Sequence, residues 1–282
     1  MTRRVFWLVV SLFVASATLL VVSFMRPPAR KVLVDGYGRL FSYPGKVKAT
    51  CPPQDPRTAV IFVAGQSNVA NHAEQRQTTA YGDRVVAFFE GACSIASSPL
   101  LGATALEGDS LTPMADELIR SGRFDRVVLA PVAVGGTEIA RWVDGDLAPV
   151  LRQALVAVQA RYRVTHAIWH QGETDADNGT SAADYRSRFD TLLDRWRAQG
   201  LTAPVLVSVT TRCDPAWKPD NPVAQAQRSL PDPARGLYLG ADSDAELPAA
   251  ELRGGECHHN AKGQAHLAKL LSTAVLSVDP AR

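Results

Sequence analysis

"VIFVAGQSNVA", residues 60–70, is the stretch of the chain that decides the fold. Four apolar residues run into Ala-Gly, and Gln66, Ser67 and Asn68 follow where the apolar run stops. A short apolar run that ends at a glycine and polar residues is typical of a buried strand and the turn after it. Taken alone, Ser67 is best interpreted as a helix cap, and a nucleophile lifted out at a strand end is the alternative.

The same pattern repeats, because short apolar runs alternate with amphipathic stretches between residues 58 and 276. Strands are predicted within 58–65, 84–91, 125–136, 165–175, 203–210 and 236–242, and helices within 111–122, 146–162, 181–200 and 260–276. Such alternation predicts an α/β fold whose mostly parallel sheet is covered by helices on both faces.

Polar clusters follow several of these predicted strands. Gln66-Ser67-Asn68 follows the first, Gly135-Gly136-Thr137 a later one and His170-Gln171-Gly172-Glu173 the next, while "GGECHHN" precedes the last helix. Function in parallel sheets sits at the carboxyl ends of strands. The sequence therefore predicts one site, at one edge of the sheet.

These clusters contain what a serine hydrolase needs, namely a hydroxyl nucleophile, a base and donors to an oxyanion. Ser67 supplies the hydroxyl and, through its backbone N–H, one donor. Gly135 or Gly136 offers a second backbone N–H, and Gln171 offers a side-chain amide. One of the two adjacent histidines before the last helix supplies the base.

In this order, "GQSN" (65–68), "GGT" (135–137), "WHQGETD" (169–175) and "HHNAKG" (258–263) resemble the motifs of the SGNH hydrolase superfamily. Within it, the chain is most similar to the sialate O-acetylesterase-like group and to carbohydrate esterase family 6. The resemblance spans roughly residues 58–276. "GQSN" alone is a weak motif, but the three blocks together, each after a predicted strand, are specific.

The resemblance implies a flavodoxin-like three-layer α/β/α sandwich and a serine esterase that removes O-acetyl groups from a carbohydrate through an acyl-enzyme on Ser67. It implies an oxyanion hole with three donors, namely the Ser67 N–H, a glycine N–H and the Gln171 side chain. For the glycine we favour Gly136. The five-residue spacing to Gly263 makes His258 the base and His259 its neighbour without that role. The family needs no metal and no organic cofactor.

The residue that orients the catalytic histidine departs from the family pattern. The family usually carries Asp three residues before that histidine, where this chain has Gly255. Three interpretations remain, which we rank in this order: Glu256 reaches His258, Glu256 and His259 form the functional pair, or a dyad works with a backbone carbonyl as the third partner.

Other residues are candidates for substrate binding or for support of the site. Gly135 forms a tight turn, and Glu173 is expected to organise its turn and bond neighbouring backbone. Asn71 and His72 follow the nucleophile turn and are candidates to line the substrate pocket. Among the tryptophans, Trp142 is the best candidate to stack on a sugar ring, because it follows the Gly-Gly turn.

The N-terminus lies outside the predicted fold. Residues 1–4 are basic, and 5–25 form a run without charge that is long enough to span a bilayer, so we favour a signal anchor over a cleaved signal peptide. Residues 26–57 are interpreted as a linker and irregular extension, and 58–282 as the esterase domain.

The Arg- and Ala-rich composition suggests a bacterial protein, which we place in the inner membrane with its catalytic domain in the periplasm or on the cell surface. The net charge of +2 and the absence of a long basic run argue against nucleic acid.

The four cysteines at 51, 93, 213 and 257 are dispersed and even in number, which favours disulfides in an oxidising compartment over a metal site. Three pairings are possible, and we favour Cys51–Cys93 with Cys213–Cys257, because each pair lies in loops beside strands of one region.

Two other functions remain open at this stage. One is an O-acetyltransferase for an envelope polysaccharide, which would use the same acyl-enzyme with a sugar hydroxyl as acceptor. The other is a carbohydrate-binding protein that has lost catalysis.

Overall fold

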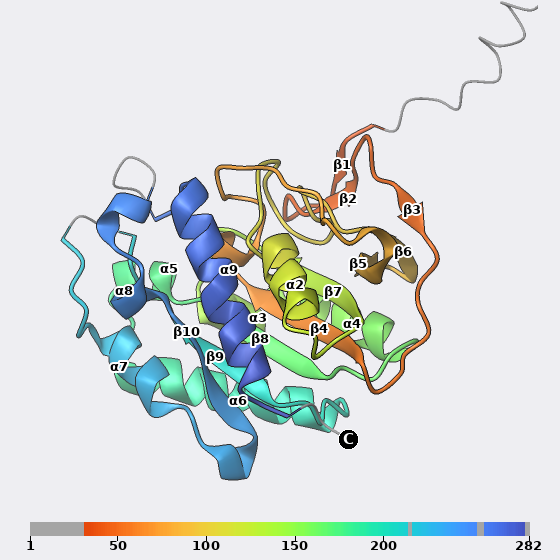
Figure 1. Ribbon diagram of the computed structural model, residues 1–282. Helices are drawn as coiled ribbons and strands as arrows, with labels where there is room; N and C mark the ends of the chain where they lie inside the picture. Colours follow the sequence, from red (N-terminus) through yellow and green to blue (C-terminus); the bar gives the residue numbers. More distant parts are fainter. Residues whose placement is uncertain (1–30, 214–215, 253–256, 280–282) are drawn as a thin grey trace, which may run out of the picture. The chain divides into compact units, whose positions relative to one another are not determined.

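The computed structural model describes residues 31–213, 216–252 and 257–279. The chain from Val32 onward forms one compact unit (Figure 1). The predicted signal anchor at 5–25 lies outside the described residues. None of the helices that are described is long and apolar enough to cross a membrane.

An eight-stranded sheet forms the centre, with the strand order β10-β9-β8-β4-β7-β5-β6-β3. Its strands are β3 (Lys48–Ala49), β4 (Thr58–Gly65), β5 (Val85–Phe89), β6 (Ala92–Ile95), β7 (Arg126–Ala133), β8 (His166–His170), β9 (Val205–Val209) and β10 (Leu237–Asp242). The strands from β10 to β5 pair in parallel, and β6 and β3 add an antiparallel margin. The predicted mostly parallel sheet is confirmed.

Strand β4 lies between β7 and β8, which follow it in the chain. Counting only β4, β7, β8, β9 and β10, the order is that of flavodoxin-like sheets, 2-1-3-4-5. β5 extends this core beyond β7. Ligands of such sheets bind at the carboxyl ends of the strands where the winding reverses, which here means at the ends of β4, β7 and β8.

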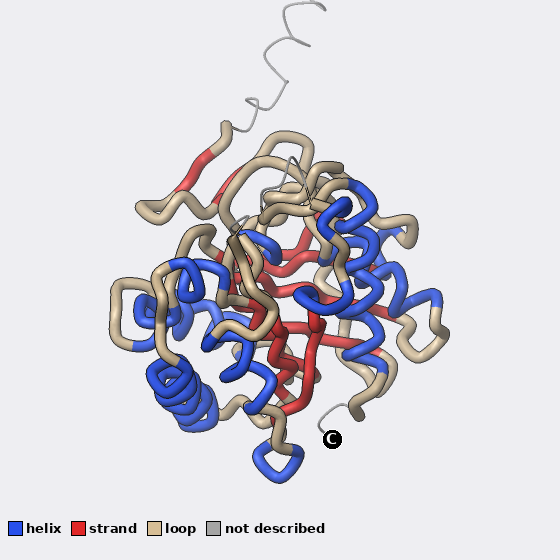
Figure 2. The backbone as a smooth tube through the Cα atoms, turned by 90° about the vertical axis from the view of Figure 1, so that its left-hand side faces the viewer, coloured by secondary structure: helices blue, strands red, loops and turns tan. Residues whose placement is uncertain are grey.

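Helices cover both faces of the sheet, and Figure 2 shows the strands between two helical layers. Val60, Phe62 and Ala64 of β4 join one core with side chains of α3 (Ile139–Val143), α4 (Ala148–Gln159), α6 (Ala182–Ala198) and α7 (Pro222–Ser229). The alternate residues Ala59, Ile61 and Val63 join a second core with α2 (Leu111–Arg120) and α9 (Ala261–Leu276). A strand buried on both faces explains the continuous apolar run from which the prediction began.

Short helices complete the loops. They are the α-helices α5 (Glu173–Asp177) and α8 (Ser243–Glu246) and the 3₁₀ helices η1 (Ser67–Val69), η2 (Gly82–Arg84), η3 (Pro233–Arg235) and η4 (Ala249–Glu251).

The segment before β4 is more regular than predicted. β1 (Leu33–Val34) and β2 (Leu40–Ser42) pair as an antiparallel hairpin, and β3 joins the sheet beside β6. Residues 32–57, expected to be irregular, thus contain short strands, because β1 and β2 pair with each other and β3 pairs with β6. Both expected disulfides are present, Cys51–Cys93 and Cys213–Cys257.

Candidate active site

Ser67 stands at the carboxyl end of β4, as the first residue of η1. The N-cap of η1 is Gln66, whose side chain makes no capping hydrogen bond, so Ser67 is not the cap. The turn before it needs glycine, because a Cβ on Gly65 would lie 2.0 Å from the carbonyl oxygen of His170. Ser67 is only 4 % exposed. The sheet therefore places this serine tightly beside the end of β8.

The Gly-Gly turn after β7 lies next to Ser67, because Gly65 pairs with Ala133 and accepts a hydrogen bond from the Val134 N–H. The N–H of Gly135 donates to Thr104 Oγ1 at 2.9 Å. Gly136 is exposed, with φ at +66°. Within the described part of the chain, the N–H groups of Ser67 and Gly136 donate no hydrogen bond. These two amides, and not that of Gly135, are available to a bound oxyanion.

Gln171 follows β8 and is fully buried. Its side-chain amide donates to the Thr137 carbonyl at 2.9 Å, to Asp175 Oδ2 at 2.5 Å and to Gln66 Oε1 at 3.2 Å. An amide has two hydrogens, and three protein acceptors already surround them. In this structure Gln171 therefore ties the turns after β4, β7 and β8 together, and the role of oxyanion donor stays a prediction.

Glu173 is the first residue of α5 and bonds side chains of neighbouring turns, whereas the sequence predicted bonds to neighbouring backbone. It is fully buried, and its Oε1 accepts from Asn68 Nδ2 and from Thr210 Oγ1, both at 2.8 Å. Burial raises the pKa of Glu173 to about 7, although hydrogen bonds from its own backbone, Asn68 and Thr210 oppose that rise. The same Asn68 amide donates to the carbonyl of Cys257 at 3.0 Å. Asn68 thus connects the Ser67 turn to the loop that carries the histidines.

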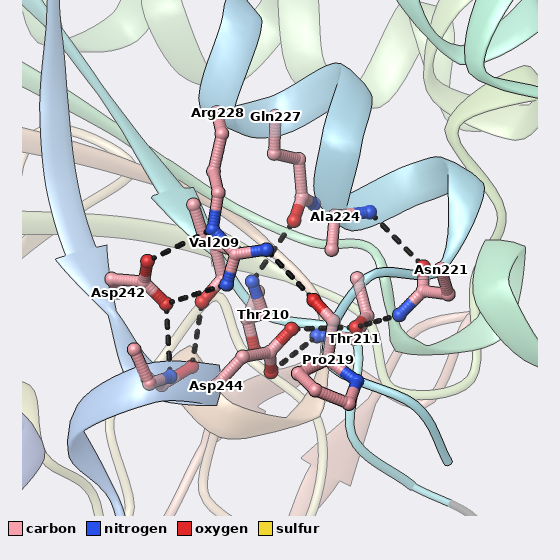
Figure 3. Close-up of polar contacts among 12 residues, drawn as sticks. Val209, Thr210, Thr211, Pro219, Asn221, Ala224, Gln227, Arg228, Asp242 and Asp244 are labelled. Atoms are coloured by element: carbon pink, nitrogen blue, oxygen red, sulfur yellow. Dashed lines mark hydrogen bonds and ion pairs between the residues drawn. The ribbon is translucent and has the colours of Figure 1, made fainter.

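The loop after β9 holds Thr210 in place (Figure 3). The Thr210 N–H donates to Gln227 Oε1 at 3.0 Å. The next residue, Thr211, donates through its N–H and its hydroxyl to the two carboxylate oxygens of Asp244, at 2.9 Å and 2.5 Å. Asn221 in turn donates to the Thr211 hydroxyl at 2.7 Å. Thr210 therefore presents its hydroxyl to Glu173 from a fixed backbone.

The two histidines before α9 lie in different surroundings. His258 is half-buried, and its ring stands 4.7 Å from the ring of His72, centroid to centroid. His259 is 3 % exposed and lines a small cavity with Asn68, Thr210 and Asp244. Glu256, the expected acid, lies outside the described residues. Of the two histidines, His258 is therefore the more exposed.

A model of the family described as carbohydrate esterase, sialic acid-specific acetylesterase, matches residues 57–277. The chain belongs to this family. It is an acetylesterase with the SGNH hydrolase architecture, as the resemblance implied. No curated protein matches the chain.

Three solved structures illustrate the shared fold. A protein from Arabidopsis thaliana is similar over 80 % of this chain and 99 % of its own, with a TM-score of 0.62 and 18 % identity. NanS matches 79 % of this chain and 97 % of its own, with a TM-score of 0.52 and 15 % identity. A carbohydrate esterase of family 3 from Talaromyces cellulolyticus matches 78 % and 97 %, with a TM-score of 0.50 and 10 % identity.

Two residues that were predicted to bind substrate are buried inside the protein. Trp142 is 1 % exposed and donates from Nε1 to Thr137 Oγ1 at 2.9 Å, so the expected sugar-stacking role is corrected by its burial. Asn71 is fully buried, where its amide donates to Leu100 O at 3.0 Å and its oxygen accepts from the Leu100 N–H at 2.6 Å. It fixes the neighbouring loop and does not line a pocket.

Sequence reasoning missed Asn68, Thr104 and Thr210 as parts of the esterase site. Asn68 stood inside the quoted motif, and its position after the nucleophile was a usable signal. Thr104 and Thr210 stood in stretches without any motif, so only the fold shows what they touch. Among the residues described here, no group of three His, Cys, Asp or Glu side chains is placed to hold a metal ion.

Proposed function

We propose that this acetylesterase removes O-acetyl groups from a carbohydrate through an acetyl-enzyme on Ser67. The Ser67 hydroxyl attacks the ester carbonyl while His258 takes its proton. His258 then returns that proton to the departing sugar alcohol. Water, deprotonated by the same histidine, attacks the acetyl-enzyme, and the histidine returns the proton to Ser67 Oγ as the acyl bond breaks and acetate is released.

One observation carries this proposal, namely the pair of backbone N–H groups on Ser67 and Gly136. They stand at the adjacent ends of β4 and β7, and within the described chain neither has an acceptor. Donors of this kind aimed at a developing oxyanion contribute about 3 kcal/mol each to catalysis. Gln171 would become a third donor if its 3.2 Å bond to Gln66 were exchanged for the oxyanion.

We propose His258, and not its neighbour, as the base, because His258 is the more exposed of the two. Glu256 remains the proposed orienting acid. Glu173 supports both halves of the site through Asn68 and has no proposed proton-transfer role.

The test is the turnover number, kcat, for a small chromogenic acetyl ester and for an O-acetylated sugar. Ser67→Ala and His258→Ala are each expected to lower kcat by at least about 10³-fold, with unchanged thermal unfolding. His259→Gln is the matched control for the neighbouring imidazole, and it is expected to keep more activity than His258→Ala. Wild-type kcat in Ser67→Ala would overturn the proposal.

We also propose that the catalytic domain works outside the cytoplasm, tethered to a membrane by residues 5–25. Its two disulfides favour an oxidising compartment. Fractionation of the full chain tests this directly. Activity in the membrane fraction, accessible to protease from the outer side, is expected, and activity in the cytosol with reduced cysteines would contradict it.

A further inference from the structure

His72 contacts both His258 and Thr104, the residue that accepts a hydrogen bond from the Gly-Gly turn. Its ring faces the ring of His258, with centroids 4.7 Å apart and planes inclined by 31°. Its Nε2 lies 3.3 Å from Thr104 Oγ1, the hydroxyl that accepts the N–H of Gly135 at 2.9 Å. The turn leaves room for this ring, because a Cβ on Gly135 would lie 2.9 Å from His72 Nε2.

The backbone around His72 is fixed on both sides. The Asn71 N–H donates to the Thr104 carbonyl and the Ala73 N–H to the Gly108 carbonyl, both at 3.0 Å. The Glu74 N–H donates to the carbonyl of His259 at 3.1 Å, which joins this segment directly to the histidine loop. A ring carried on such a backbone has little freedom to move away from its neighbours.

We infer that His72 is a positioning residue for His258. Its ring presents a flat face that limits how the His258 imidazole can rotate. The contact of its Nε2 with Thr104 Oγ1 fixes the position of that ring relative to the glycine turn. The inference rests on the proposed function, because it takes His258 as the base. It assigns His72 no contact with the reacting atoms.

The two contacts of His72 can be separated by substitution. His72→Phe keeps the flat face but loses the polar edge toward Thr104. His72→Gln keeps a polar group near the position of Nε2 but loses the face, and His72→Ala loses both. His266→Ala is the matched control, since His266 is also a half-buried histidine and its Nδ1 lies 2.9 Å from Glu251 Oε2.

The experiment measures kcat and KM for the four variants, on a small acetyl ester and on an O-acetylated sugar. His72→Ala is expected to lower kcat about 10- to 100-fold on both substrates with little change in KM, because small misplacements of a catalytic group are costly. His72→Phe should recover most of that loss, whereas His72→Gln should not. His266→Ala should keep wild-type kcat.

Three outcomes would overturn the inference. A rise in KM confined to the sugar ester would make His72 a substrate contact. A lower unfolding temperature with normal kcat per folded molecule would make it merely structural, and equal recovery by Gln and Phe would remove the role of the ring face. Combining His72→Ala with His258→Ala adds a further check, since the double variant should be no slower than His258→Ala alone.

Failure of the proposed function looks different. If Ser67→Ala and His258→Ala keep wild-type kcat, the proposed mechanism fails whatever His72 does. If both are inactive and His72→Ala has normal kcat and KM, only the positioning role fails.

Discussion

The Ser67 half of the site and the His258 half are held by different means. Ser67 follows a strand that is paired on both sides, so that Gly65 faces Ala133 on one neighbour and His170 on the other. His258 follows a disulfide-bonded cysteine in a loop, whose carbonyls accept from Asn68 and Glu74. The sheet fixes Ser67, the proposed nucleophile, whereas contacts between segments far apart in the chain fix His258, the proposed base.

The difference has a consequence for substitutions. A substitution that alters the backbone before Ser67 acts through packing at the end of β4, so stability and activity should fall together. A substitution in the His258 half removes one of a few contacts between distant segments. It can therefore lower kcat without destabilising the protein more than a comparable substitution elsewhere does.

Outside the proposed catalytic residues, the largest effect is expected at Gly65. In Gly65→Ala the new Cβ would stand 2.0 Å from the His170 carbonyl, so the strand end and Ser67 must shift. We expect a loss of about 3 kcal/mol in unfolding free energy and about 100-fold in kcat. Denaturant unfolding and initial rates measure both, with Gly122→Ala as a control at another positive-φ glycine where a Cβ meets nothing within 4 Å. Parallel losses at the two glycines would show that backbone strain, and not the contact with His170, is responsible.

The disulfides offer a matched pair with a smaller effect. Their sequence separations are 42 and 44 residues, so chain entropy predicts a similar loss of about 2–4 kcal/mol from removing either. Only Cys213–Cys257 adjoins a histidine of the site. The double variant Cys213→Ser/Cys257→Ser is therefore expected to lose about tenfold in kcat as well, and Cys51→Ser/Cys93→Ser is not. Equal kcat for the two folded double variants would argue that the disulfide does not position His258.

The last effect concerns the pH dependence of stability through Glu173, which lies between the two halves. Burial raises its pKa from 4.5 to about 7 in the folded state. Between these two pH values, the folded protein therefore keeps a proton on Glu173 that the unfolded chain has lost. This contribution to stability is therefore greatest below the unfolded pKa and is lost as pH rises toward about 7. Glu173→Gln cannot titrate, so it should remove a pH-dependent change in unfolding free energy of up to about 3 kcal/mol, which corresponds to a pKa shift from 4.5 to about 7.

The measurement is thermal unfolding of the wild type and of Glu173→Gln in buffers on either side of that pH range. Asp232→Asn, a substitution at a half-buried carboxylate that caps η3, is the control for a general charge effect. A wild-type profile unchanged by Glu173→Gln would show that another group dominates.

The same contrast explains what could be predicted from the sequence. The strand at 58–65 and the helix at 260–276 were predicted within one residue, because apolar periodicity and end signals are local. The short strands β3 and β6 were not, since two to four residues without periodicity give no signal. Helix α7 was missed although Asn221 and Pro222 form a usable start signal.

Within the site, the motifs identified residues but not their surroundings. The Gly135 and Gly136 amides have opposite fates, one donated to Thr104 and one available, and the sequence gives no means to tell them apart. Trp142 was predicted to stack on a sugar ring because it follows the Gly-Gly turn, yet it lies on α3 with its side chain in the core. The His72–His258 contact joins distant segments, and no local pattern encodes such a contact.

The central claim is that Ser67 carries the acetyl group during turnover. The direct measurement is rapid quenching of the enzyme with an acetyl ester, followed by peptide mass spectrometry to locate the added acetyl group. The account predicts one acetyl group on the peptide that contains Ser67, and none in Ser67→Ala. Turnover with no acetylated Ser67 peptide under conditions where the acetyl-enzyme accumulates, or with the acetyl group on another residue, would contradict it.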